Sequence, residues 1–182
     1  MERCLGIVEF RSIAIGIGAV DTIVKASDVR ILDAKTICPG KYYIVFGGSV
    51  SAVKSSLEQV VAEDETFIID HCMLSNVYPE IFSALNQASS ITDLKSIGVI
   101  ETLTSPSIFM AADSAIKATS VELVEIRIAR ALGGKNICIL NGDVSSVQES
   151  VRAGIKYAGD KGFLVDWQVI ASPHADLYRA IL

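Results

Sequence analysis

The sequence lacks any apolar run of the roughly 20 residues that a membrane-spanning helix needs. It also lacks an excess of basic residues, with 16 lysine and arginine residues against 21 aspartate and glutamate residues. The net charge of −5 argues against a nucleic-acid-binding protein, which normally presents a basic face. The early charged residues Glu2, Arg3 and Glu9 do not fit a secretory signal. Because 51% of the 182 residues are hydrophobic, we expect a folded intracellular protein.

The sequence also lacks a C-x-x-C pair. The four cysteines, Cys4, Cys38, Cys72 and Cys138, lie far apart, and disulfides are not expected in the reducing cytosol. Cys138 lies in an apolar run, where a small buried side chain is the usual role, and Cys4 and Cys72 are interpreted in the same way. Complete G-x-G-x-x-G, P-loop and G-x-S-x-G motifs are also missing, so we do not expect an enzyme.

What the sequence does contain is a tandem repeat. The segment LGIVE at residues 5–9 matches IGVIE at residues 97–101, and at the same offset Asp21 and Lys25 match Asp113 and Lys117. Farther along, the turn GGS at residues 47–49 matches NGD at residues 141–143 after a two-residue insertion in the second copy. The match is too long and too ordered for chance.

Both repeats predict the element order β-α-β-β-α-β followed by a short helix, which is an α+β sandwich with one sheet and helices on one side. In the first repeat, apolar residues recur at helical spacing at Ile13, Ile17, Val20 and Val24. The fourth strands are expected at residues 66–70 and 163–167. In the second repeat, the segment SSVQ at residues 145–148 resembles a capping box at the start of its second helix. A polar, serine-rich linker is expected at residues 86–95.

The opening G-I-V-E followed by A-x-D-x-x-x-K-A-S/T-x-V resembles the bacterial microcompartment shell proteins in their tandem-domain form. The resemblance covers nearly the whole chain, and the segment KTICPGK at residues 35–41 is similar to the loop of the iron–sulfur shell trimers of propanediol-utilising compartments. It implies two microcompartment domains, at residues 1–90 and 91–182, and a pseudohexameric homotrimer. Such trimers pack edge to edge into a protein shell around metabolic enzymes in the bacterial cytoplasm.

The resemblance also implies roles for particular residues. Lys25 and Lys117 correspond to edge lysines through which a trimer contacts other shell proteins, although each also fits an i, i+4 ion pair on a solvated helix. The loops around residues 38–41 and 131–135 would surround the central axis of the trimer. Because the second of these loops has no cysteine, three copies of Cys38 would meet there.

One cysteine cannot hold a 4Fe–4S cluster, which normally takes about four thiolates. Three Cys38 thiolates at a three-fold axis could hold it, with water or an outside ligand on the fourth iron. Pro39 would fix the turn, and Gly40 would let the backbone approach the sulfur atoms closely. Such a cluster would pass single electrons across the shell, and encapsulated redox enzymes are candidate partners.

Three alternatives remain open at this stage. The trimer could be a pore that conducts or binds small metabolites without a metal cluster, with Cys38 merely lining the passage. Three thiolates could instead bind a mononuclear metal ion. The chain could also be a free oligomeric redox enzyme unrelated to shells.

Overall fold

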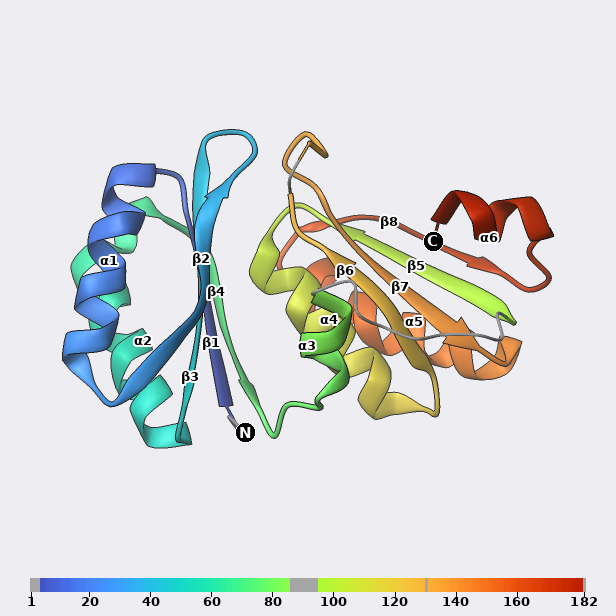
Figure 1. Cartoon of the computed structure of the whole chain (residues 1–182), viewed down its shortest axis with the longest axis horizontal. Coiled ribbons are helices and arrows are strands. Elements are labelled where there is room, and N and C mark those ends of the chain that lie inside the picture. The colour runs from blue at the N-terminus through green and yellow to red at the C-terminus, as the bar shows by residue number, and fades with distance from the viewer. Residues whose placement is uncertain (1–3, 86–94, 130, 182) are drawn as a thin grey trace. The chain divides into compact units, whose positions relative to one another are not determined.

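The computed structural model describes residues 4–85, 95–129 and 131–181 (Figure 1). The chain divides into two compact units. Unit 1 consists of Met1–Val77, Thr104–Ser107 and Ala129–Lys135, and unit 2 consists of Tyr78–Leu103, Ile108–Ile128 and Asn136–Leu182. The expected domain boundary at residues 90 and 91 and nearly all of the expected linker lie outside the described residues. No helix in the described part of the chain is long and apolar enough to cross a membrane.

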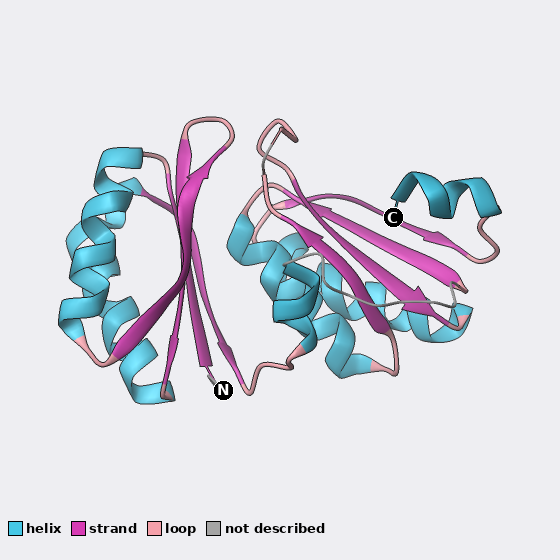
Figure 2. Ribbon diagram, viewed as in Figure 1, coloured by secondary structure: helices cyan, strands magenta, loops and turns pink. Residues whose placement is uncertain are grey.

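Unit 1 is built on a four-stranded antiparallel sheet. In spatial order its strands are β2 (Val29–Ile37), β3 (Lys41–Gly48), β1 (Cys4–Phe10) and β4 (Ile68–Ser75). Two helices, α1 (Ile13–Ala26) and α2 (Val50–Asp64), cover one face of this sheet, and the 3-10 turn η1 (Glu65–Phe67) leads into β4 (Figure 2). Large apolar side chains such as Phe10, Ile23 and Phe46 fill the core between the helices and the sheet.

Unit 2 repeats this sheet. In spatial order its strands are β6 (Glu122–Arg127), β7 (Asn136–Gly142), β5 (Ser96–Thr102) and β8 (Leu164–Ile170). The helices of the second repeat are α4 (Ser105–Ala118), α5 (Val144–Asp160) and α6 (Ala175–Ile181). The short helix α3 (Glu80–Leu85), from the end of the first repeat, packs against β6 within unit 2.

The predicted α+β class and element order are confirmed, and the repeat extends to the pairing register. Glu9 on β1 lies opposite Asp70 on β4, and Glu101 on β5 lies opposite Asp166 on β8. Buried serines also match. Ser56 of α2 donates to the carbonyl oxygen of Ile23 at 2.9 Å, and Ser150 of α5 donates to that of Ala115 at 2.8 Å.

Two local predictions are wrong. The fourth strands begin and end later than expected, at Ile68–Ser75 and Leu164–Ile170. In the first repeat, Glu65–Phe67 form η1 instead, and pairing with the whole length of β1 carries β4 on to Ser75. The capping box is also wrong, because Asp143 is the N-cap of α5 and the helix begins directly after it.

The predicted helix α1 is present and buries Ile23, but three of its other large apolar residues face outward. Ile13, Ile17 and Val24 are 36%, 56% and 42% exposed, whereas the buried residues include Gly16 and Ala19. Small residues face the sheet because the helix backbone lies close to it: a Cβ atom on Gly16 would stand 2.6 Å from the Cβ of Tyr42. α1 therefore presents an unburied apolar surface.

Candidate metal centre

Cys38 lies in the short loop between β2 and β3, at the end of unit 1 where these strands are joined. Its side chain is half-buried, and Pro39 and Gly40 beside it are exposed. Gly40 has φ of +73°, in the left-handed region that glycine tolerates and most other residues do not. The loop thus has the exposed turn predicted from the C-P-G sequence.

The corresponding loop of the second repeat packs against this turn within unit 1. The backbone N–H of Cys38 donates to the carbonyl oxygen of Ala129 at 2.8 Å. Gly134, with φ of +89°, lies so close that an added Cβ would stand 2.9 Å from Cδ of Pro39 and 3.3 Å from the carbonyl oxygen of Cys38. Ala129 and Gly134 therefore fix the position of Cys38. No local sequence pattern predicts this role, although the G-G pair at residues 133–134 indicates a turn.

An ion pair holds the base of the loop. Lys41, the first residue of β3, donates to Glu9 Oε1 at 2.7 Å, and the Glu9 side chain is completely buried. The other oxygen, Oε2, accepts the backbone N–H of Ser105 at 2.5 Å. On the other strand, Lys35 pairs with Asp33 at 2.7 Å, and the Tyr43 hydroxyl also donates to Asp33. Charges on both strands are thus paired beside the turn.

The remaining cysteines are unsuited to binding a metal. Cys4, Cys72 and Cys138 are buried, as predicted. Burial raises the pKa of Cys138 to about 12 and raises that of Cys4, so both thiols stay protonated at neutral pH. Cys72 Sγ donates to the carbonyl oxygen of Pro106 at 3.4 Å.

The described residues of one chain contain no group of three or more His, Cys, Asp or Glu side chains placed to hold a metal ion. Cys38 thus supplies a single soft donor at this loop. A thiolate-bound metal would require copies of Cys38 from several chains, as the sequence analysis supposed.

The two candidate edge lysines differ in their surroundings. Lys25 pairs with Asp21 at 2.5 Å, and both side chains are largely exposed. Lys117 pairs with Asp113 at 2.7 Å, but the Asp113 side chain is only 9% exposed. Burial raises the pKa of Asp113, and the Lys117 ammonium partly opposes that rise. Lys25 is therefore the more accessible of the two.

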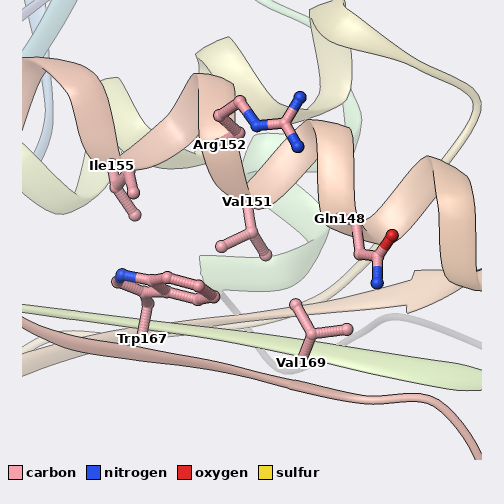
Figure 3. Close-up of a pocket in the computed structure, with 6 residues that line it drawn as sticks. All are labelled: Gln148, Val151, Arg152, Ile155, Trp167 and Val169. Carbon is pink, nitrogen blue, oxygen red and sulfur yellow. The ribbon is translucent and has the colours of Figure 1, made fainter.

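A groove of about 320 Å³ runs between α5 and β8 in unit 2. In Figure 3 the indole of Trp167 lies beneath Val151 and Ile155, and Arg152 extends from the same helix. Trp167 is 46% exposed. The groove is lined by the apolar residues Val151, Ile155 and Val169 as well as the polar residues Gln148 and Arg152.

Comparisons with known proteins agree with the repeat. The family model of the BMC domain matches residues 4–79 and 96–173. The bacterial microcompartment shell protein PduT of Citrobacter freundii is 35% identical over 182 residues, which cover 100% of this chain and 99% of that protein. A microcompartment protein of Desulfitobacterium hafniense DCB has a crystal structure that superposes with a TM-score of 0.84 at 44% identity, covering 97% of this chain and 98% of that one.

A more distant structure shows the same fold. The fused permuted hexameric shell protein of the RMM microcompartment superposes with a TM-score of 0.62 at 19% identity, covering 82% of this chain and 78% of that one.

Proposed function

The chain belongs to the BMC-domain family, as a tandem-domain shell protein of bacterial microcompartments, and we propose that three copies form a ring that binds one 4Fe–4S cluster through Cys38. In this proposal the ring closes part of the shell and passes electrons across it. Family membership makes its basic role structural rather than catalytic.

The position of Cys38 carries this proposal. Its thiol is half-buried in an exposed turn, whereas the other three thiols of the chain are buried. The Cys38 turn also contacts the Ala129–Lys135 loop, its counterpart in the second repeat, within unit 1. Contact between counterpart loops is expected when repeats are arranged around a common axis. Three chains would then bring three Cys38 thiols to that axis.

The donor set fits an iron–sulfur cluster better than it fits a hard metal ion. Thiolates are soft ligands, and a 4Fe–4S cluster takes about four of them. Three would come from Cys38, which leaves one iron for water or an outside ligand. A bound cluster supplies a centre that accepts and releases single electrons. The protein's own part is to hold the sulfur atoms in place, through the Ala129 carbonyl and the close approach of Gly134.

The proposal extends to partners. Other shell proteins would contact the ring at its edges through Lys25 and Lys117, whose side chains are 73% and 32% exposed. Encapsulated redox enzymes would exchange electrons with the ring on the inner side of the shell. Because Lys25 is the more exposed of the two, an edge contact through Lys25 is better supported than one through Lys117.

Anaerobic purification followed by visible and electron paramagnetic resonance spectroscopy tests the proposal. We expect a brown protein with broad visible absorbance that dithionite bleaches reversibly. A colourless trimer would instead support a metabolite pore, and bound metal without inorganic sulfide would support a mononuclear site. Turnover of a soluble substrate by the isolated protein would point to an enzyme.

Replacing Gly134 with alanine is expected to loosen the cluster. The new Cβ would collide with Pro39 and press on the Cys38 carbonyl, so the sulfur atoms would shift from their common centre. Overpacking of this kind costs about 1 kcal/mol or more, and we expect the cluster to be lost in air about five times faster than in the unsubstituted protein. The rate is followed by the decay of visible absorbance.

Gly133→Ala is the matched control. Gly133 also has a positive φ, of +61°, but a Cβ there would meet nothing within 4 Å. Both variants carry backbone strain, and only Gly134→Ala adds the collision. Equal decay rates in the two variants would contradict a positioning role for Gly134.

A further inference from the structure

In unit 1, the first turn of helix α4 packs against the sheet. The N-terminal turn of α4, residues 104–107, packs against β1 and β4, where Glu9 and Asp70 are both buried. Asp70 Oδ2 accepts the hydroxyls of Thr104 at 2.6 Å and Ser107 at 2.9 Å. Glu9 Oε2 accepts the backbone N–H of Ser105. Two carboxylates at the positive end of a helix form favourable, charge-assisted hydrogen bonds.

Unit 2 carries the matching carboxylates in a more open setting. Asp166 occupies the position of Asp70, and its Oδ1 accepts the next backbone N–H at 2.8 Å, as Asp70 Oδ1 does at 2.9 Å. Asp166 is nevertheless exposed, whereas Asp70 is 3% exposed. Glu101, the counterpart of Glu9, is half-buried rather than fully buried. Unit 2 thus repeats the acceptor side of the contact, and its Asp166 is accessible.

The start of α1 repeats the donor side. Ser12 is the N-cap of α1 and accepts the N–H of Ile15 at 3.4 Å, as Thr104 accepts that of Ser107 at 3.4 Å. The α4 turn is buried, but in the α1 turn Ile13 is 36% exposed and Ala14 is exposed as well. In each chain, the α4 turn already occupies the carboxylates of unit 1. The carboxylate of Asp166 in unit 2 and the α1 turn are both accessible to another molecule.

We infer that the turn at residues 12–15 of one chain docks on Glu101 and Asp166 of a second copy of the chain. Ser12 would donate its hydroxyl to Asp166, and the backbone N–H of Ile13 would donate to Glu101, as Thr104 and Ser105 do in unit 1. Donor and acceptor lie on different surfaces, so the contact is head-to-tail and can close into a ring. The inference rests on the ring of the proposed function and identifies the residues that close it.

The sequence differences between the two contacts suit a contact between chains. Ile13 and Ile15 replace Ser105 and Ser107, so the docked turn is more apolar than its counterpart. Gln168 occupies the register position of Cys72. Its amide can donate to the Ala14 carbonyl, in the way that Cys72 donates to Pro106. Burial of exposed isoleucines would then add to the stability of the contact.

Sedimentation velocity over a concentration series tests the inference with Asp166→Lys, in which a cation faces the positive end of α1. The substitution removes the hydrogen bond from Ser12 to the Asp166 carboxylate, and hydrogen bonds to charged groups are stronger than those between neutral groups. We therefore expect the dissociation constant of the ring to rise about tenfold to hundredfold. Asp160→Lys, the same exchange at an exposed position of α5, is the matched control and should leave assembly unchanged.

A paired-cysteine variant tests proximity directly. Ser12→Cys combined with Asp166→Cys should form disulfide-linked dimers and trimers on oxidation, and neither single variant should form them. An unsubstituted protein that is monomeric would overturn the proposed ring itself. A stable unsubstituted ring that tolerates D166K and fails to cross-link would overturn only this docking contact.

Discussion

Replacing Cys38 with serine is expected to remove all iron and sulfide from the protein while the trimer persists. A serine hydroxyl is a hard, weakly acidic donor and a poor substitute for a thiolate at an iron–sulfur cluster. Cys38 is half-buried in an exposed turn, so this substitution should not disturb the fold. The readouts are metal analysis, visible absorbance and native mass, all measured on protein purified without oxygen.

Cys72→Ser is the matched control for this prediction. Cys72 is buried and bonds to the Pro106 carbonyl, a contact that a serine hydroxyl can also make. We expect this variant to retain its iron. If Cys38→Ser dissociates the trimer instead, Cys38 is a structural residue and the redox proposal loses its support.

Replacing Glu9 with alanine is expected to lower the free energy of unfolding by about 3 kcal/mol. Glu9 is completely buried, and its two oxygens bind the Lys41 ammonium and the Ser105 N–H. Removal of one partner of a buried ion pair costs about 3–5 kcal/mol. We expect a loss of stability at the lower end of this range because the Lys41 side chain is still 17% exposed to water. Urea unfolding of unit 1, followed by a probe in that unit, measures the effect.

Glu58→Ala serves as the control in the same unit. The Glu58 side chain is 67% exposed, and its pair with Lys54 spans 3.8 Å, so its loss should cost at most about 0.5 kcal/mol. Similar losses in the two variants would contradict the role of Glu9 in joining β1, β3 and the start of α4.

The sequence predicted the fold well because duplication is visible in local patterns. The strand–helix opening around Gly6 and Gly98, and the ion pairs Asp21–Lys25 and Asp113–Lys117, recur at a fixed offset and need no knowledge of distant contacts. The burial of Cys138 also followed from its apolar run, and that of Cys4 and Cys72 from the general tendency of free cysteines to be buried.

What the sequence could not predict depends on contacts between distant segments. Helical spacing identifies α1 but not which face is buried, and close packing at Gly16 leaves Ile17 outside. Likewise, no local pattern pairs Thr104 with Asp70, or Gly134 with Pro39. The contact of Gly134 with Pro39 holds the Cys38 turn. The contact of Thr104 with Asp70 is the basis of the contact proposed between chains.

Iron and acid-labile sulfide, counted per trimer in protein purified without oxygen, test the central claim most directly. The account predicts a complex of three chains with about four irons and four sulfides, one cluster shared among three copies of Cys38. A monomer, or a trimer with neither iron nor sulfide under these conditions, would contradict it.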